Sequence, residues 1–239
     1  MKLDILVFAA HPDDAELSCA GTIMSHIKQG KKVGIVDLTR GELGTRGTAA
    51  TRYQEAAAAS KIMGISIRDN LGFADGFFQN DSLHKLAVIK KIRQYQPEIV
   101  LANAIHDRHP DHAKGAKLVA ESCFLAGLIK IVTLDEIGQT QAAWRPKSVY
   151  HYIQDTYIAP DFVVDITDFI AQKEAAIKAF KTQFHDPESD EPTTYISNAS
   201  YLDAVRSRAT DIGKQVGFRY AEGFTKTRII GVNNLFDLK

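Results

Sequence analysis

The sequence LDILVFAAHPDD, at residues 3–14, joins an apolar run to a sharp polar turn. Residues 3–10 are aliphatic and β-branched, which predicts a buried strand. The turn that follows places the imidazole of His11 near the carboxylates of Asp13 and Asp14. These are side chains that bind a divalent metal ion, so the end of this strand is a candidate metal site.

A second cluster of the same kind, His109-Pro110-Asp111-His112, follows another apolar run at residues 99–104. In sheets built from parallel strands, ligands bind in the crevice beyond the carboxyl ends of the strands. Both clusters are expected at that edge. We therefore expect them to form one site.

Strands and helices alternate through the first half of the chain. We expect strands over residues 3–10, 33–38, 65–71 and 99–104, and helices over residues 16–29, 51–63, 82–95 and 111–124, the last capped by Asp111. This alternation predicts an α/β fold, a Rossmann-like three-layer α/β/α sandwich with a mainly parallel sheet.

The second half is less regular. We expect short strands over residues 149–153 and 162–166, a helix capped by Asp168 with an apolar face that reaches residue 184, and a further helix over 201–216. The Pro-, Asp- and Glu-rich residues 185–194 are predicted to form a loop, from which His185 could reach the site. No long linker divides the chain, so residues 1–239 are predicted to form a single domain.

The composition excludes several classes of partner. Lysine plus arginine and aspartate plus glutamate balance at 29 each, so nothing directs the molecule to nucleic acid or to an anionic membrane. No apolar stretch approaches the roughly 20 residues that span a bilayer. Two cysteines cannot form a disulfide framework, and both are expected as reduced core thiols. A cytoplasmic location is expected.

The chemistry of the clusters divides the two aspartates. A catalytic zinc site keeps three protein ligands and one position open for water. Adjacent residues on a turn point in different directions, so we assign Asp14 to the metal, with His11 and His112, and Asp13 to the water as its base. One Zn²⁺ per subunit is expected, although Fe²⁺, Co²⁺ and Mn²⁺ suit the same ligand types.

The second cluster also offers an acid. Asp111 is expected to bond one ring nitrogen of His109 and to hold it cationic or in the correct tautomer. His109 would then donate a proton or a hydrogen bond to the reacting centre. Metal, base, acid and orienting residue make a complete set for hydrolysing an amide.

The motifs themselves resemble a known family. Residues 9–16, AAHPDDAE, and the later His109-Pro110-Asp111-His112 look like the paired motifs of the LmbE/PIG-L family of zinc-dependent N-deacetylases. The turn at residues 39–42 and the helix start at residues 51–55 resemble it too, and the likeness covers essentially the whole chain. The nearest branch includes the N-acetylglucosaminyl-malate deacetylase of bacillithiol biosynthesis.

This resemblance implies roles residue by residue. The family's metal ligands match His11, Asp14 and His112, and its base matches Asp13. The histidine that matches His109 stabilises the transition state or acts as the acid, supported by an aspartate that matches Asp111. The resemblance also implies a homo-oligomer, with a hexamer as one form.

Candidate substrate-binding residues follow the predicted strands. Arginines gathered in the crevice would grip an anionic group, such as the malate carboxylates of the substrate that the resemblance implies. Solvated surface arginines, and a salt bridge for Glu42, stay open as alternatives. The candidates are Arg52, Arg108, Arg46, Glu42 and, by resemblance to a family tyrosine, Tyr195.

Three functional hypotheses result. The leading one is a metal-dependent hydrolase that removes acetate from N-acetylglucosaminyl-L-malate, a small N-acetyl sugar with an anionic aglycone. The second is a deacetylase of another small N-acetyl sugar of the diacetylchitobiose type. The third is a sugar- or nucleotide-binding module whose metal only orders the loops. A spare carboxylate at Asp13 favours the enzymes.

Overall fold

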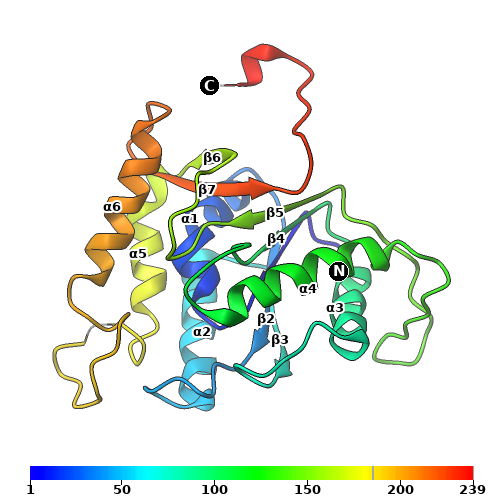
Figure 1. Ribbon diagram of the computed structural model, residues 1–239, viewed down its shortest axis with the longest axis horizontal. Helices are drawn as coiled ribbons and strands as arrows, with labels where there is room; N and C mark the ends of the chain where they lie inside the picture. The colour runs from blue at the N-terminus through cyan, green and yellow to red at the C-terminus, as the bar shows by residue number, and fades with distance from the viewer. Residues whose placement is uncertain (185, 239) are drawn as a thin grey trace.

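The fold is built on one seven-stranded sheet, ordered β3-β2-β1-β4-β5-β7-β6 in a computed structural model that describes residues 1–184 and 186–238 (Figure 1). The strands are β1 (Ile5–Ala9), β2 (Val33–Thr39), β3 (Ile67–Phe73), β4 (Ile99–Ala102), β5 (Ser148–Tyr152), β6 (Phe162–Asp165) and β7 (Ala221–Lys226). The helices are α1 (Asp14–Lys28), α2 (Ala49–Met63), α3 (Ser82–Tyr95), α4 (Pro110–Ala126), α5 (Ile170–Lys178) and α6 (Tyr201–Lys214), with short 3₁₀ turns at Thr167–Phe169 and Leu235–Asp237.

The five strands from β3 to β5 run parallel, as the alternation of strands and helices predicted. β1 lies between β2 and β4 and pairs with both, with Val7 opposite Ile35 on one side and Leu101 on the other. Only β7 runs antiparallel, between β5 and β6. The α/β class with a mainly parallel sheet is therefore confirmed.

Alternate residues of β1 support two different cores. Leu6 and Phe8 pack into a cluster with apolar side chains of α3 and α4, such as Val88 and Leu118. Residues on the other face of the strand pack into a second cluster with α1 and α5, through side chains such as Ile23. A strand that is buried on both faces must be apolar throughout, which is why β1 reads as a continuous apolar run.

Two features of the second half differ from the prediction. The helix expected to reach residue 184 ends at Lys178, and Phe180 and Phe184 are buried beyond it in a third cluster with α2 and α6. The strand β7 was not predicted, because its sequence AEGFTK carries a charge and a glycine where a buried strand is normally apolar.

The charge in β7 belongs to Glu222, which repairs a break in α1. This helix loses helical geometry at Cys19, and the freed backbone N–H groups of Gly21 and Thr22 donate to the Glu222 carboxylate at 3.0 and 2.7 Å. Lys173 from α5 completes the site, with its Nζ 2.6 Å from Glu222 Oε1. Glu222 thus joins the sheet to both helices of this layer.

Gly21 is needed at the same place for a steric reason. A Cβ on Gly21 would lie 2.6 Å from the side chain of Ile166, closer than real Cβ contacts come. At this point α1 lies against Ile166, in the loop after β6, in a space that a Cβ would fill.

Two composition-based expectations can be compared with the structure. Cys19 and Cys123 are both buried and unpaired, as expected of core thiols. Among the described residues, no helix combines the length and the apolar content that crossing a membrane requires.

We expect Glu222→Ala to lower the free energy of unfolding by about 3–5 kcal/mol, because it leaves the Lys173 ammonium buried without its partner. The exposed pair between Glu174 and Arg206 provides the control, and Glu174→Ala should change stability by less than about 1 kcal/mol. Urea denaturation of the two variants measures the difference. Equal losses would contradict a structural role for the buried pair.

Candidate active site

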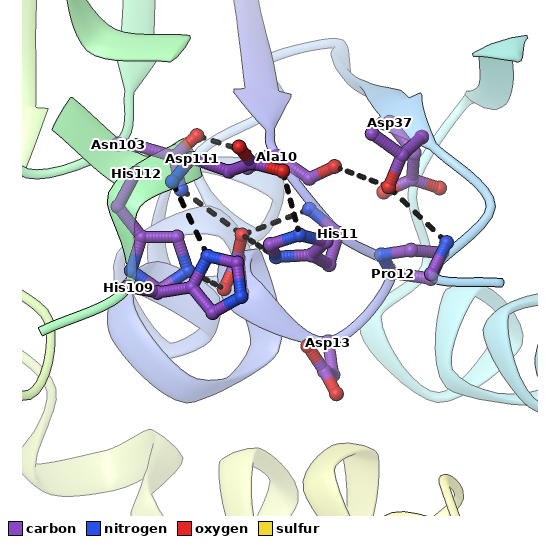
Figure 2. A network of polar contacts seen from close by, with 12 residues as sticks. Ala10, His11, Pro12, Asp13, Asp37, Asn103, His109, Asp111 and His112 are labelled. Atoms are coloured by element: carbon purple, nitrogen blue, oxygen red, sulfur yellow. Dashed lines mark hydrogen bonds and ion pairs between the residues drawn. The ribbon is translucent and has the colours of Figure 1, made fainter. Parts of the chain in front are cut away.

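The two predicted clusters meet at the carboxyl edge of the sheet, as Figure 2 shows. His11 follows β1, while His109 and His112 stand at the first turn of α4. Ligand atoms of these three histidines all lie within 4.8 Å of one another. The ring centroids of His11 and His109 are 4.6 Å apart. The shared site that the sequence predicted is therefore present.

The turn after β1 holds its residues by local hydrogen bonds. The backbone N–H of His11 donates to Asp14 Oδ2 at 2.9 Å, and the N–H of Asp14 donates to the carbonyl of His11 at 3.3 Å. Between them Asp13 has a φ of 118°, a backbone conformation that residues other than glycine rarely adopt. This backbone turns the carboxylates of Asp13 and Asp14 in different directions.

Asp14 lies between two histidines. Its Oδ2 is 3.5 Å from His11 Nδ1, and its Oδ1 is 3.1 Å from His112 Nε2. Two amides orient the carboxylate, because Asn103 Nδ2 and Gln154 Nε2 each donate to one of its oxygens at 3.0 Å. The three predicted metal ligands are therefore together and fixed in orientation.

The outer nitrogens of both histidines are held by further carboxylates. His11 Nε2 lies 3.0 Å from Asp75 Oδ1, and His112 Nδ1 lies 2.5 Å from Asp107 Oδ2. Metal-binding histidines almost always carry such a partner, which fixes the ring tautomer and orientation. The residues present therefore fit a divalent ion bound between His11, Asp14 and His112.

The electrostatics of the cluster favour a cation. Burial lowers the pKa of His112, but the carboxylates of Asp14 and Asp107 outweigh it and raise that pKa to about 9. Burial raises the pKa of Asp107, but its hydrogen bond to His112 outweighs this effect and lowers the pKa to about 2. The carboxylates thus stabilise positive charge at this point, whether it is carried by protons or by a metal ion.

Asp13 has a different environment. It is buried, and burial raises its pKa to about 7 although the charge of Arg52 opposes the shift. Arg52 Nη2 donates to Asp13 Oδ2 at 2.9 Å and also to the carbonyl of Pro12, while Nη1 donates to the carbonyl of Gly41 at 3.1 Å. A Cβ on Gly41 would lie 1.9 Å from Arg52 Nη1, so only glycine leaves room for this guanidinium.

His109 is oriented differently from the prediction. Its Nδ1 accepts from the backbone N–H of Asp111 at 3.2 Å, so the neutral ring carries its proton on Nε2. Burial lowers the pKa of His109, and the neighbouring His11 and His112 lower it further, which favours the neutral ring over the cation. The predicted helix cap is also wrong, because His109 caps α4 and Asp111 lies inside its first turn.

The carboxylate of Asp111 makes other contacts than the expected one to His109. It accepts from the backbone N–H of Gly76 at 2.7 Å and from Lys114 Nζ at 2.9 Å, and Oδ2 lies 3.5 Å from His11 Nε2. From the first turn of α4, the Asp111 side chain points toward His11, the residue that follows the end of β1. Asp111 therefore supports His11, and it orients His109 only through its backbone N–H.

A cavity of about 240 Å³ opens on this cluster. Of the five predicted substrate-binding residues, Arg52 and Arg108 line it. Arg52 is buried and paired with Asp13, so its guanidinium is not free for a substrate. Arg108 is half exposed at the mouth, with its guanidinium 4.3 Å from the centre of the Tyr195 ring.

The other three candidates lie outside the lining of this cavity. Arg46 is paired with Glu191, and Glu42 accepts from the backbone N–H of Asp75 at 3.0 Å, so both tie loops together. Tyr195 is exposed, with its hydroxyl 3.3 Å from Asp155 Oδ1. His185, which the sequence placed in a loop that could reach the site, lies outside the described residues.

Several site residues were missed by the sequence analysis. Most of them follow the carboxyl end of a parallel strand, which is the signal that located His11 and would have located them. They are Asp75 after β3, Asn103 and Asp107 after β4, and Gln154 and Asp155 after β5. Arg208, which also lines the cavity, comes from α6 and carried no such signal.

Comparison with known proteins links this geometry to one family. A family model described as PIG-L, GlcNAc-PI de-N-acetylase, matches residues 6–123, the part of the chain that supplies both histidine clusters. The chain is 29% identical to a diacetylchitobiose deacetylase of Thermococcus kodakarensis, over 92% of this chain and 81% of that protein.

Two further relatives have other described activities. The chain is 28% identical to a 4-oxalmesaconate hydratase of Pseudomonas putida, over 75% of this chain and 74% of that protein. It is 30% identical to a probable N-acetyl-α-D-glucosaminyl L-malate deacetylase 2 of Bacillus anthracis, over 49% of this chain and 58% of that protein. The described activities of these relatives therefore differ from one another.

Among solved structures, the chain is similar to the conserved protein TT1542 of Thermus thermophilus. The two superpose with a TM-score of 0.85 at 35% identity, over 97% of this chain and 98% of that one. The likeness covers the antiparallel end of the sheet as well as the parallel part.

We expect Asp107→Asn to weaken divalent-metal affinity by roughly 10–100-fold, because it removes the carboxylate behind His112. Asp81→Asn is the matched control, since Asp81 holds His84 Nδ1 at 2.8 Å outside the cluster and asparagine caps α3 equally well. Competition for Zn²⁺ with a chromophoric chelator measures both. Unchanged affinity in Asp107→Asn would show that His112 needs no such support.

Proposed function

Since this chain belongs to the PIG-L family of deacetylases, we propose that it is a zinc-dependent amidohydrolase that releases acetate from a small N-acetyl sugar. The observation that carries the proposal is the division between two adjacent carboxylates. Asp14 is enclosed by His11 and His112, whereas Asp13 faces the same cavity with Arg52 as its charged partner. A site that only held a metal would need no second buried carboxylate there.

The bound ion would be held by His11, Asp14 and His112. When bound, a divalent ion polarises an amide carbonyl and makes a coordinated water more acidic. Asp13 then acts on the attacking water as the base, taking the proton that the water loses. Arg52 keeps Asp13 ionised and aimed at the cavity, since its charge lowers the pKa that burial raises.

His109 supplies a hydrogen-bond donor to the same reaction. Because its Nδ1 accepts from the backbone of Asp111, its Nε2–H is the donor that remains for a substrate. A fixed donor of this kind stabilises the negative charge that develops on the carbonyl oxygen. The proton held by Asp13 passes to the amine nitrogen as the C–N bond breaks, so the sugar leaves as a neutral amine.

The mouth of the cavity favours an anionic substituent. Arg108 Nε lies 3.4 Å from Asp155 Oδ2, and Arg208 Nη2 lies 3.3 Å from Asp155 Oδ1. Two guanidinium groups share one carboxylate there, so that, among the described residues, one positive charge at the entrance has no carboxylate of its own. N-acetylglucosaminyl-L-malate carries the carboxylates that would pair with it, which supports a place in bacillithiol biosynthesis.

The second candidate is a sugar of the diacetylchitobiose type. It is favoured by the relative in Thermococcus kodakarensis, which aligns with nearly the whole chain. This substrate is neutral, so the arginine pair at the mouth would contribute little to its binding. Comparing the two substrates therefore tests the role of that pair.

We expect Asp13→Asn to reduce acetate release from either sugar by about 10²–10⁴-fold, as loss of a general base does, while metal content stays near one per chain. Asp168→Asn, at an exposed carboxylate beside Lys28, should leave both unchanged. Coupled acetate assay and elemental analysis measure the two properties. Full turnover in Asp13→Asn would remove Asp13 as the base.

We expect Arg208→Met to reduce kcat/KM for N-acetylglucosaminyl-L-malate by about 10–100-fold, as loss of a charged hydrogen bond does, and to affect diacetylchitobiose much less. Arg206→Met is the matched control, because Arg206 lies on the same helix but pairs with Glu174. Equal losses on the two sugars would contradict recognition of an anionic group. No acetate from either sugar, with metal bound, would contradict the deacetylase proposal itself.

A further inference from the structure

The catalytic cavity has one apolar wall that is packed against the core. It consists of Leu17, Ile196 and Tyr201, all of which belong to the third apolar cluster or pack against it. Tyr201 is buried, and Leu17 and Ile196 are partly buried. Leu43, the other large apolar residue of the lining, lies on a loop and is 62% exposed. We call the first three residues the wall.

Leu17 places the wall beside the proposed base. It lies on α1 one turn after Asp13, and its backbone N–H donates to the carbonyl of Asp13 at 2.9 Å. The mouth of the cavity is polar instead, because Arg108 and Arg208 meet Asp155 there. An N-acyl sugar carries a polar ring on one side of its amide and an alkyl chain on the other. The mouth therefore suits the sugar, and the wall suits the acyl chain.

A second cavity borders the same wall. Its volume is about 20 Å³, compared with about 240 Å³ for the catalytic cavity. The two cavities share three lining residues, namely Leu17, Ser18 and Arg208. These shared residues form the partition between the two spaces, and Leu17 is its apolar member. We call the smaller space the inner cavity.

The inner cavity combines apolar sides with one charged boundary. Val205 and Ile212 of α6 line it, and both are buried. The ion pair of Lys173 and Glu222, with Nζ 2.6 Å from Oε1, lines it too. An alkyl chain that entered this space would gain contacts with α6, but it could not pass the ion pair without burying charge that has lost its partner. The inner cavity can therefore extend the catalytic cavity only by a short distance.

We propose that Leu17 sets the length of the acyl group that this chain removes, by separating the catalytic cavity from the inner cavity. The proposal rests on the deacetylase function proposed above. With leucine in place, an acetyl group fits beside the wall, whereas a longer chain meets the Leu17 side chain. Forcing extra methylenes into such a packed space is unfavourable, because the neighbouring side chains have to leave their preferred positions. Truncation of Leu17 joins the two cavities and admits a longer chain as far as the ion pair.

A series of acyl groups on the same sugar tests the proposal. The N-acetyl, N-butanoyl and N-octanoyl forms of glucosaminyl-L-malate and of chitobiose are compared. In each case water adds to the acyl carbon and the C–N bond breaks, so each sugar yields the same amine and one amine assay gives kcat/KM for the whole series. We expect the unaltered chain to favour acetyl over butanoyl by about 10–200-fold, as extra methylene groups in a fitted pocket do.

Leu17→Ala should raise the ratio of kcat/KM for butanoyl to that for acetyl by about the same factor. The octanoyl sugar should stay a poor substrate of this variant, because the ion pair of Lys173 and Glu222 closes the joined space. Leu17→Val is a milder truncation and should shift the ratio in the same direction. It keeps the test valid if Leu17→Ala does not fold.

Val205→Ala is the matched control. Val205 belongs to the same apolar cluster and lines the inner cavity but not the catalytic cavity. Its truncation therefore enlarges the inner cavity and leaves the partition intact. This variant should keep the acyl preference of the unaltered chain.

The outcomes separate this inference from the proposed function. If the metal-loaded unaltered chain released no amine from any of the sugars, the deacetylase function itself would be wrong. If it released amine but both Leu17 variants kept its acyl preference, or Val205→Ala shifted that preference equally, only the role of Leu17 would be overturned. An unaltered chain that cleaves the butanoyl sugar as readily as the acetyl sugar would also overturn that role.

Discussion

The buried carboxylates around His11 and His112 are the constraint on which the site depends. All four of these carboxylates have side chains less than a tenth exposed: Asp14 contacts both rings, Asp75 and Asp111 contact His11, and Asp107 contacts His112. Carboxylates cannot be buried together without a compensating cation, because an unpaired buried charge is costly. The loops after β1, β3 and β4 are thus held together by the contacts of these carboxylates with the two rings.

The same constraint separates Asp13 from its neighbours. Its ion-pair partner is Arg52, which comes from α2 and is itself held by the carbonyls of Pro12 and Gly41. In the proposed function, binding and proton transfer fall to adjacent residues, and the positive φ of Asp13 is the backbone feature that separates their directions.

Prediction from sequence succeeded for strands whose apolar residues have to be buried, because the apolar run itself then marks the strand. The apolar runs of β1 and β4 must be buried on both faces, and the polar residues that follow them must then lie at the carboxyl edge. It failed for β7, where Glu222 is acceptable in a buried strand only because Lys173 and the broken turn of α1 satisfy it. For Arg46 and Glu42, substrate binding stays a prediction, and in the structure both contact residues of other loops.

By itself, the sequence determined the α/β class, the two turns that carry the histidines, and the identity of Asp13 and Asp14 as neighbours with separate directions. Only the tertiary structure decided which carboxylate supports which ring, that the carboxylate of Asp111 contacts His11 and not His109, and that Arg52 pairs with Asp13. The reason is distance along the chain. His11 meets Asp75 across 64 residues, and Arg52 meets Asp13 across 39, through crossovers whose end points are set by the packing of helices on the sheet.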